Sequence, residues 1–378
     1  MPKTFPRVLH VGPLPPPVGG VALSLQAILR CPALQDFDNR VFNTSEGRLT
    51  EVVGRKGLTL ERFVRRMKLI LQLARHVRQM RPELVHFQCG SEGALDILGD
   101  LLMVWASCLA GGPVILHLHV DPATADLPGR NPFGQWLFRR LIRPVSAIFT
   151  LTEGYHEHLL SCSVRQLIRV APNTCDETLL TLPVDRPRAS ETVRILFLGR
   201  LTRAKGIFDL LEVAARLHTE HPEIHFDIAG LPSTPDEERL IREFLERERL
   251  QETLTLVGLV TGPDKLKLFE RGDILLAPSY WESFGIVAIE GMAAGLPVVA
   301  ANVPGLKSIV VEGETGYLVE PGDVESLKQH LARLAKDKNL REQLGRAGRK
   351  RFLERYSLQR VGAVIAETYH QILEKETI

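Results

Sequence analysis

Residues 277–305 decide the fold, and they read APSYWESFGIVAIEGMAAGLPVVAANVPG. The mostly apolar residues 273–277 predict a short buried strand just before the loop. A helix is expected from about Phe284 to Ala294, with Ser283 as its N-cap residue, because serine caps helices well and glycine and proline follow the last helical residue. A second strand begins at Val298. This order of strand, loop, helix and strand is typical of open α/β sheets, which bind ligands in loops at the carboxyl ends of their strands.

The start of this helix is suited to a phosphate. The backbone amides of Phe284, Gly285 and Ile286 are expected there, and Gly285 lets the backbone approach a ligand closely. Glu282 and Glu290 flank these amides in the sequence. Because carboxylates accept hydrogen bonds from vicinal hydroxyls, a phosphate site between two carboxylates suits a phosphorylated sugar. The alternative is that both glutamates are solvated surface charges.

The same stretch carries a longer pattern of spaced residues. It reads Pro278-Ser279-x-x-Glu282-x-Phe284-Gly285-x5-Glu290-x-Met292-Ala293-x-Gly295-x-Pro297-Val298-Val299. This pattern resembles the signature of family 4 of the retaining GT-B glycosyltransferases, in which two glutamates with this spacing bind the nucleotide-sugar donor. One position departs from the commonest form, since Ser283 stands where the family usually has glycine.

The resemblance implies a fold and a donor site. The fold would be GT-B, an α/β architecture of two Rossmann-like doubly wound domains with a donor cleft between them. Glu282 would be a catalytic residue that orients sugar hydroxyls, and Glu290 would hold the ribose. The donor would also contact the start of the helix, at Ser283, Phe284, Gly285 and Ile286.

Length and composition indicate a two-domain globular protein. The chain has 378 residues, which is too long for one ordinary core, and a formal net charge of +2, which does not suggest a general nucleic-acid binder. Its five cysteines are widely spaced and odd in number, so we expect reduced thiols. We recognise no signal peptide, and the most apolar window, residues 95–115, is interrupted by glycine, aspartate and proline. These features favour a cytoplasmic protein.

The chain opens with a strand over residues 7–11, a glycine-rich loop that ends in Gly19-Gly20, and a helix over residues 21–29. This is the first βα unit of a Rossmann-like domain. Neither the dinucleotide fingerprint nor the P-loop sequence occurs. The resemblance implies that Gly19 and Gly20 place a backbone amide against the donor diphosphate. A purely structural turn is the alternative.

A second loop of the same kind follows the strand predicted over residues 193–198. It carries Arg200 and Lys205, a planar guanidinium and a point charge that suit a diphosphate. Gly199, Arg200, Lys205 and Gly206 match a G-R-x4-K-G element of the family, so the resemblance implies that both cations stabilise the departing nucleoside diphosphate. We expect neither a metal nor another cofactor. Solvated surface cations are the alternative.

His117 and His119 lie two residues apart on a predicted strand, so their side chains point to one face, with Asp121 next in the row. Three interpretations compete: a His-His-Asp metal site, two packed core histidines, or a histidine that faces the donor at the strand end. The resemblance favours His119 as the catalytic histidine near the donor sugar. A different register of the strand would put His117 in this position instead.

The family usually continues Pro172-Asn173 with glycine, and this chain has Thr174 instead. The turn after Asn173 is therefore not predicted. The polar, proline-containing residues 185–191 predict the linker. We expect an N-terminal acceptor domain over residues 1–185, a donor domain over 186–355, and a final helix over 356–378 that crosses back to the first domain, as the resemblance implies.

A helix over about residues 60–80 has two interpretations. Seven Lys and Arg and no acidic residue lie between Arg62 and Arg81, and one apolar face is expected from Phe63, Met67, Ile70, Ala74 and Val77. The helix could pack on the sheet with a solvated basic face, or it could lie on anionic lipid at the inner face of the membrane. The basic and apolar residues 136–143 support the second interpretation.

These expectations combine into one function. We expect a retaining glycosyltransferase of hexosyltransferase type, which moves a sugar from a UDP-, GDP- or similar nucleotide-diphosphate sugar to a glycan or lipid-linked glycan acceptor in surface polysaccharide biosynthesis. A GT-B sugar-nucleotide epimerase, a phosphorylase and a non-catalytic nucleotide-sugar-binding partner are the alternatives.

Overall fold

The computed structural model describes residues 5–16, 19–45, 60–90, 93–121, 128, 131–185 and 192–376. The chain divides into two compact units. Unit 1 comprises Met1–Cys175 and Leu358–Ile378, and unit 2 comprises Asp176–Ser357. The first boundary falls earlier than the predicted linker because the 3-10 helix η2 (Glu177–Thr181) packs on helices of unit 2. Most of that linker, residues 186–191, lies outside the described residues.

The described part of unit 1 forms one sheet of six parallel strands in the order β2-β1-β3-β4-β5-β6. The strands are β1 (Arg7–Gly12), β2 (Asp38–Asn43), β3 (Leu84–Cys89), β4 (Val114–Leu118), β5 (Ala147–Thr150) and β6 (Leu167–Val170). The helices are α1 (Gly20–Leu29), η1 (Pro32–Leu34), α2 (Leu60–Met80), α3 (Ala94–Ala110), α4 (Pro132–Leu141), α5 (Glu153–Ser161) and α13 (Leu358–Glu376).

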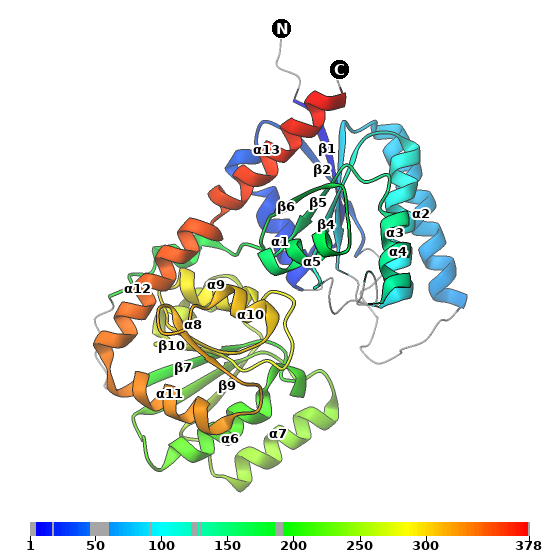
Figure 1. Ribbon diagram of the computed structural model, residues 1–378. Helices are drawn as coiled ribbons and strands as arrows, with labels where there is room; N and C mark the ends of the chain where they lie inside the picture. The colour runs from blue at the N-terminus through cyan, green and yellow to red at the C-terminus, as the bar shows by residue number, and fades with distance from the viewer. Residues whose placement is uncertain are drawn as a thin grey trace. The chain divides into compact units, whose positions relative to one another are not determined.

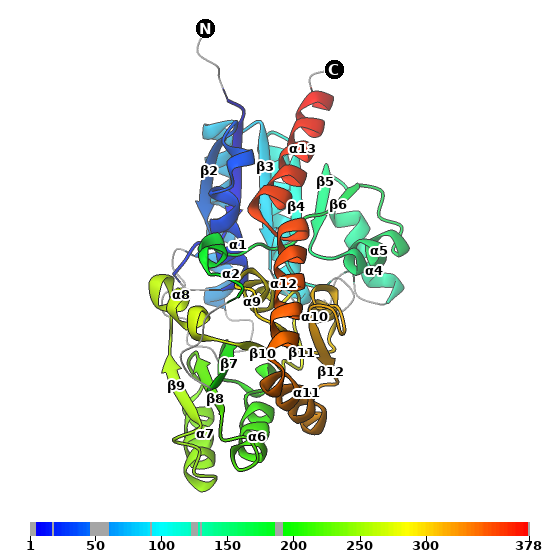
Figure 2. The same cartoon turned by 90° about the vertical axis from the view of Figure 1, so that its left-hand side faces the viewer.

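Two apolar layers cover the two faces of this sheet. Neighbouring strand residues alternate between the layers: Val8 and Ile115 face α1, η1 and α13, whereas Leu9 and Leu116 face α2 to α5. Figure 1 shows α13 on one side of the sheet and α2 and α3 on the other, and Figure 2 shows α13 lying across β3 and β4. The last helix of the chain is thus a structural part of unit 1.

Helix α2 is rotated relative to the sequence-based expectation. Its fully buried residues are Leu73 and Val77, whereas Met67, which was expected on the packed face, is 39% exposed. Arg66 points instead toward α3, where it forms ion pairs with Asp96 and Asp100, both at 2.7 Å. These bridges fix the rotation of α2 and turn Met67 outward, so the expected apolar face is wrong at this residue.

The described part of unit 2 forms a second sheet of six parallel strands in the order β12-β11-β10-β7-β8-β9. The strands are β7 (Val193–Leu198), β8 (Ile224–Ala229), β9 (Leu254–Gly258), β10 (Ile274–Ala277), β11 (Val298–Ala301) and β12 (Gly316–Val319). The helices are η2, η3 (Arg203–Lys205), α6 (Ile207–His218), α7 (Pro235–Arg247), α8 (Gly262–Arg271), α9 (Ile286–Ala293), α10 (Pro304–Ile309), α11 (Val324–Lys336) and α12 (Lys338–Arg355).

The strand order of unit 2 reverses between β7 and β10. Strands β8 and β9 follow β7 on one side, while β10 pairs with β7 on the other, with Ile195 opposite Ile274. At such a reversal the loops after the two central strands diverge and leave room for a ligand at the carboxyl edge. The two doubly wound α/β sheets predicted from the sequence are confirmed. In the described part of the chain, no helix combines the length and the apolar character that a membrane span requires.

Candidate functional site

The loops after β7 and β10 of unit 2 are held together by backbone contacts. Gly206, at φ 72°, ends η3 in the left-handed region, and a Cβ at this position would overlap the carbonyl oxygen of Pro278. The amide of Tyr280 donates to the carbonyl oxygen of Ala204 at 2.9 Å. Side chains that lie far apart in the sequence therefore meet at the carboxyl edge of this sheet.

Glu282 lies at this meeting point and pairs with Lys205. The Nζ atom of Lys205 contacts Oε1 of Glu282, and the Ser279 hydroxyl donates to the same oxygen at 3.3 Å. The Glu282 side chain is only 15% exposed. The structure thus brings together two of the predicted catalytic residues, and Glu282 is not a solvated surface charge.

Glu290 is paired in the same way by a residue that the sequence analysis missed. Its side chain is 6% exposed, and its Oε1 lies 2.5 Å from Nζ of Lys265 in α8. No local signal identifies Lys265, because it is one of several charged residues in an amphipathic helix. Only the packing of α8 near α9 places its ammonium group on the second glutamate.

Arg200 lies two residues after the end of β7 and is exposed. Its guanidinium forms no hydrogen bond or ion pair with any other residue that the structure describes. An anion can therefore approach it without breaking an existing pair, whereas an anion at Lys205 competes with Glu282. The edge thus offers cations for phosphate oxygens and paired carboxylates for hydroxyl groups.

The predicted start of helix α9 is wrong by two residues. The N-cap residue is Gly285, with φ 102° and ψ 61°, and the helix begins at Ile286. Glycine adopts this left-handed conformation readily, and a Cβ here would lie 2.6 Å from Leu306 of α10. Ser283 is therefore not the N-cap residue, and Phe284, which is buried against Tyr356, belongs to the core.

Gly19 and Gly20 lie at the start of α1 in unit 1. Gly19 is the N-cap residue, with the extended backbone angles φ −151° and ψ 161°, and Gly20 is the first helical residue and is exposed. A Cβ on Gly19 would meet no atom within 4 Å. The fold itself does not need glycine at residue 19, so a role in binding stays a prediction.

His117 is a core histidine of unit 1. Its Nε2 atom donates to the carbonyl oxygen of Ala171 at 2.9 Å, and its Nδ1 atom lies 3.2 Å from Nε2 of His86. Both ring nitrogens are thus engaged, which contradicts the metal-site interpretation. Within the described ranges, no group of three His, Cys, Asp or Glu residues could hold a metal ion.

The hydrogen bonds of His117 fix a one-way chain. A carbonyl oxygen only accepts, so a neutral His117 carries its proton on Nε2 and its bare Nδ1 accepts from His86. His86 then accepts at Nδ1 from the hydroxyl of Tyr369 in α13, at 2.6 Å. The chain runs from Tyr369 through His86 and His117 to Ala171, and each histidine in it is neutral.

His119 lies one residue beyond the end of β4 and stacks on His117, with ring centroids 4.4 Å apart. Its Nε2 atom lies 2.6 Å from Oε1 of Gln88, which accepts. Apart from a contact with the Asn173 side chain, the Nδ1 atom has no hydrogen-bond partner among the described residues, and the ring is only 5% exposed. Of the two histidines, His119 is the one that can still bind a ligand.

Burial determines the protonation of these histidines. It lowers the pKa of His10 and of His117 to about 4, against the stabilising contacts of Asn39 and Ala171. Burial and the neighbouring His117 also lower the pKa of His119, while a hydrogen-bonding contact with the Asn173 side chain acts in the opposite direction. The imidazoles are therefore neutral near pH 7.

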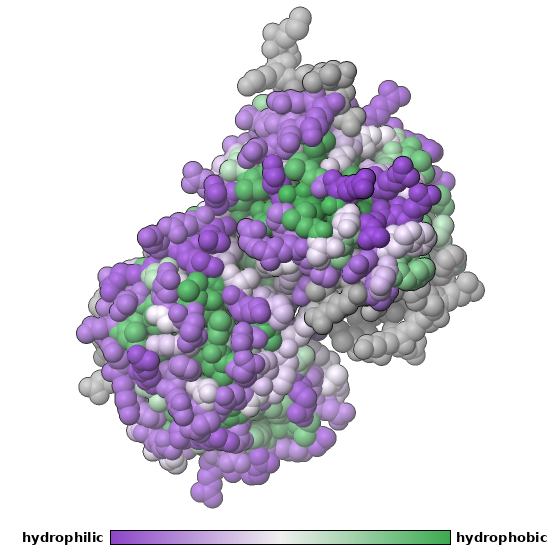
Figure 3. All heavy atoms as spheres, viewed as in Figure 1, coloured by the Kyte–Doolittle hydropathy of each residue, from purple (hydrophilic) through white to green (hydrophobic). Residues whose placement is uncertain are grey.

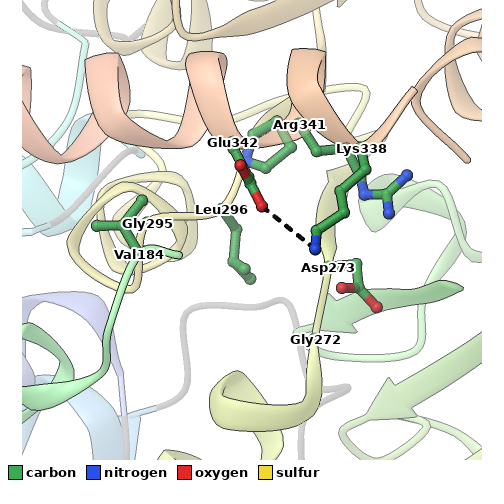
Figure 4. Close-up of a pocket in the computed structure, with 9 residues that line it drawn as sticks. Val184, Gly272, Asp273, Gly295, Leu296, Lys338, Arg341 and Glu342 are labelled. Atoms are coloured by element: carbon green, nitrogen blue, oxygen red, sulfur yellow. Dashed lines mark ion pairs between the residues drawn. The ribbon is translucent and has the colours of Figure 1, made fainter. Parts of the chain in front are cut away.

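A hollow in unit 2 lies at the opposite edge of the sheet. Figure 4 shows its lining, which includes Asp273, Leu296 and three residues of α12. Two of those, Lys338 and Glu342, form an ion pair at 3.7 Å. Asp273 and Leu296 precede β10 and β11, so the hollow is at the amino ends of the strands, away from the predicted site residues. We do not assign the functional site to it.

Two family models match the chain: glycosyl transferases group 1 over residues 182–351, and glycosyl transferase 4-like domain over residues 8–174. D-inositol 3-phosphate glycosyltransferase of Paenarthrobacter aurescens is 32% identical over 281 residues, which cover 70% of this chain and 68% of that protein. The chain belongs to the group 1 glycosyltransferase family.

Other similar proteins agree with this membership. Glycogen synthase of Mycobacterium tuberculosis is 28% identical over 305 residues, which cover 77% of this chain and 69% of that protein. Anabaena HepE, solved in complex with UDP-glucose, superimposes with a TM-score of 0.73 at 19% identity and covers 97% of this chain and 99% of its own. This likeness confirms the expected GT-B fold of the glycosyltransferase.

Gly206 and Gly258 allow a matched test of the loop contact. Both are left-handed glycines of unit 2, at φ 72° and 79°, but a Cβ at Gly258 would meet no atom within 4 Å. We expect Gly258→Ala to cost about 1 kcal/mol through backbone strain and Gly206→Ala about 2–4 kcal/mol, because the second must also displace Pro278. Urea unfolding of both variants measures this, and equal losses would contradict the proposed contact.

Because these histidines are buried as neutral rings, we expect the folded protein to lose stability in acid. Since folding lowers the pKa of His10 and His117 from 6.5 to about 4, unfolding takes up protons between these values. Stability is complete above pH 6.5 and decreases as the pH falls toward 4, by about 1.4 kcal/mol per pH unit for each histidine. Urea unfolding at pH 7.5, 6.5 and 5.5 tests this.

In that experiment a Trp281→Phe background leaves Trp105 and Trp136 of unit 1 as the fluorescent reporters. The control is the unfolding free energy at pH 8.5, which should equal the unfolding free energy at pH 7.5. An unfolding free energy that stays constant from pH 7.5 to 5.5 would show that these histidines titrate normally in the folded chain.

Proposed function

We propose that this group 1 glycosyltransferase is a retaining hexosyltransferase that uses a nucleotide-diphosphate sugar and acts on a glycan or lipid-linked glycan acceptor in surface polysaccharide biosynthesis. The observation that carries the donor proposal is the pair of largely buried Lys–Glu contacts, together with the exposed Arg200 in the loop after β7, at the reversal of the unit 2 sheet. Solved structures of Anabaena HepE with UDP and with UDP-glucose support a donor of this class.

The residues of unit 2 are assigned roles from their chemistry. Arg200 and Lys205 neutralise the charge that grows on the departing diphosphate, which makes a metal unnecessary for this purpose. Glu282 orients hydroxyls of the transferred sugar, and Glu290 accepts from the ribose hydroxyls. The first amides of α9 and the amides at Gly19 and Gly20 are proposed to contact the diphosphate.

The reaction proceeds by attack of the acceptor hydroxyl on the face that the leaving group occupies. The bond between the anomeric carbon and the phosphate oxygen breaks, the bond to the acceptor oxygen forms, and the hydroxyl proton passes to the departing phosphate. No carboxylate acts as a nucleophile in this scheme, in agreement with the lysine partner of Glu282. His119 is proposed to hydrogen-bond the reacting sugar.

A ligand screen tests the donor proposal. We expect one of UDP-, GDP-, ADP- and TDP-glucose to raise the unfolding midpoint, with and without EDTA, because a ligand that binds only the folded state stabilises it. Glu290→Gln should weaken that donor about 10- to 100-fold, since hydrogen bonds to charged groups contribute about 1.5–3 kcal/mol. The control is Glu220→Gln, which removes an exposed ion-paired carboxylate of the same unit.

The reaction products distinguish glycosyl transfer from the alternative functions. Acceptor-dependent glycoside formation with retained anomeric configuration supports the proposal. Interconversion of the donor sugar indicates an epimerase, release of sugar 1-phosphate in the presence of phosphate indicates a phosphorylase, and donor binding without turnover indicates a binding protein. A midpoint shift that EDTA abolishes would contradict the metal-independent scheme.

We also propose that unit 1 contacts anionic lipid through the outer face of α2. This face combines exposed apolar and basic side chains, namely Val64, Met67, Lys68, Leu71, Arg75 and Arg78. On the side of unit 1 where α2 to α4 lie, Figure 3 shows apolar and polar side chains intermixed. Phe133 and Trp136 of α4 are exposed and stack at 5.9 Å. Such a surface inserts apolar groups while its cations bind phosphate headgroups.

Vesicle sedimentation tests this surface. The protein should bind vesicles of 70% phosphatidylcholine and 30% phosphatidylglycerol and not pure phosphatidylcholine, with binding reduced by salt. Lys68→Glu with Arg75→Glu should abolish binding, whereas Arg242→Glu with Arg247→Glu on α7 reverses as many charges in unit 2 and should not. Equal binding by both double variants would exclude α2 as the contact.

A further inference from the structure

A layer of polar rings lies beneath the C-terminal helix α13 in unit 1. On three adjacent strands the layer contains His10, His86 and His117, and each of these side chains is fully buried. Helix α13 adds the ring of Tyr369, which is fully buried as well. Two residues earlier, each of the three strands carries a buried apolar residue instead, namely Val8, Leu84 and Ile115. Apolar residues can therefore fill this core, and the polar rings need a separate explanation.

Stability alone does not account for these rings. When apolar side chains of similar shape replace both partners of a buried hydrogen bond, the cost is usually small and the change can even stabilise the fold. Here the hydroxyl of Tyr369 lies 2.6 Å from Nδ1 of His86, and Nε2 of His86 lies 3.2 Å from Nδ1 of His117. This hydrogen-bond chain occupies core positions that apolar residues could fill, which points to a role beyond packing.

The direction of the hydrogen-bond chain is fixed at both ends. At one end the carbonyl oxygen of Ala171 can only accept, and it does so from Nε2 of His117 at 2.9 Å. At the other end, burial raises the pKa of Tyr369 well above its ordinary value, so its hydroxyl keeps its proton and donates to His86. Each of the two histidines therefore carries its proton on Nε2 and has only one tautomer that satisfies both of its neighbours.

The rings of the hydrogen-bond chain are also held by their aromatic neighbours. The rings of His86 and His117 lie within 7° of parallel, and each meets the ring of Phe149 in β5 at a centroid distance of 5.4 Å. Tyr369 packs edge-to-face against Phe37 at 5.2 Å. Position and tautomer are thus both determined for each ring.

The ring of His117 is the surface on which His119 stacks. The two ring centroids are 4.4 Å apart, and the ring planes differ by 25°. Gln88, at 2.6 Å, and the side chain of Asn173 contact the nitrogen atoms of His119. The stacking on His117 therefore sets the plane of the His119 ring, while the two amides set its rotation within that plane.

We propose that Tyr369 and His86 are positioning residues of this glycosyltransferase. They hold His117 as a neutral support of fixed orientation, and His117 in turn fixes the plane of His119; this inference rests on the contact of His119 with the reacting sugar proposed above. Loss of the hydrogen-bond chain should slow the reaction of the sugar, because small displacements of a group at the reacting atoms are costly. The affinity for the nucleotide should not change, since neither Tyr369 nor His86 is among the proposed nucleotide contacts.

Tyr369→Phe is the decisive variant because it keeps the ring and removes only the hydroxyl. Without this donor, His86 can adopt its other tautomer, in which it no longer donates to His117. The control is Thr368→Val at the preceding residue of α13, whose similarly buried hydroxyl donates to the carbonyl oxygen of Val364 at 2.8 Å. Each variant removes one hydrogen-bonded hydroxyl from the same helix, and only Tyr369→Phe should alter His119.

NMR of the ligand-free protein with isotope-labelled histidine measures the imidazoles directly. The ring signals of His119 are those that His119→Gln removes. We expect Tyr369→Phe to shift these signals and Thr368→Val to leave them at their wild-type positions. Signals of His119 that do not move in Tyr369→Phe, or that move equally in Thr368→Val, overturn the inference.

Kinetics measure the effect on the reaction, with UDP-glucose as the probe and water as the acceptor. Tyr369→Phe should lower kcat for UDP release about three- to tenfold, the effect of one neutral hydrogen bond, with KM and the calorimetric affinity for UDP unchanged. His86→Leu should also lower kcat, and Tyr369→Phe should add no further loss to it, because the hydroxyl acts through His86. A wild-type kcat in Tyr369→Phe, or two losses that multiply in the double variant, contradicts the positioning role.

The two measurements separate this inference from the proposed function. A wild type that releases no nucleotide from UDP-, GDP-, ADP- or TDP-glucose, with His119 signals that move only in Tyr369→Phe, contradicts the donor proposal and supports the positioning of His119. Turnover by the wild type, with His119 signals that stay unmoved in Tyr369→Phe, does the opposite.

Discussion

The close approach of Gly206 to the carbonyl oxygen of Pro278 is the constraint on which the unit 2 site depends. Only a residue without a Cβ allows the loop after β7 to contact the loop after β10. With this contact in place, Lys205 reaches Glu282 and the amide of Tyr280 bonds to Ala204. The sheet positions the ends of β7 and β10. The glycine determines how closely the side chains of the two following loops can approach each other.

Both glutamates of the site are largely buried and both are paired with lysine. A carboxylate in such surroundings needs a cation close by, since burial without a partner favours its neutral form. Lys205 and Lys265 therefore hold the carboxylates of Glu282 and Glu290 in position as hydrogen-bond acceptors before any ligand arrives. Arg200 is exposed, so a phosphate can bind its guanidinium without breaking an existing ion pair.

Unit 1 differs from unit 2 in the polar side chains that it buries. Its sheet buries histidines, whereas the site of unit 2 holds ion-paired glutamates. His10, His86 and His117 stand on three adjacent strands beneath α13, where each needs a neutral ring and a hydrogen-bond partner. Asn39, Tyr369 and the Ala171 carbonyl supply those partners. The C-terminal helix consequently contributes to the arrangement of side chains at the strand ends as well as to the apolar core.

The sequence by itself determined what depends on local pattern and spacing. Alternating apolar runs and helical periods predicted two doubly wound sheets. The motifs after two strands placed Arg200, Lys205 and Glu282 in loops at the carboxyl edge and Glu290 in the helix that follows. These features could be predicted because strand order, loop position and motif residues all follow from short segments of chain.

Only the tertiary structure decided which side chains meet across long separations in the sequence. The pairing of Lys265 with Glu290 depends on how α8 packs, the start of α9 depends on the space that Leu306 leaves at Gly285, and the rotation of α2 depends on the pairing of Arg66 with α3. The hydrogen-bond chain from Tyr369 to His117 became visible only with the packing of α13 on the sheet. The physical reason is that burial and hydrogen-bond partners belong to the packed chain, and no local pattern of residues encodes them.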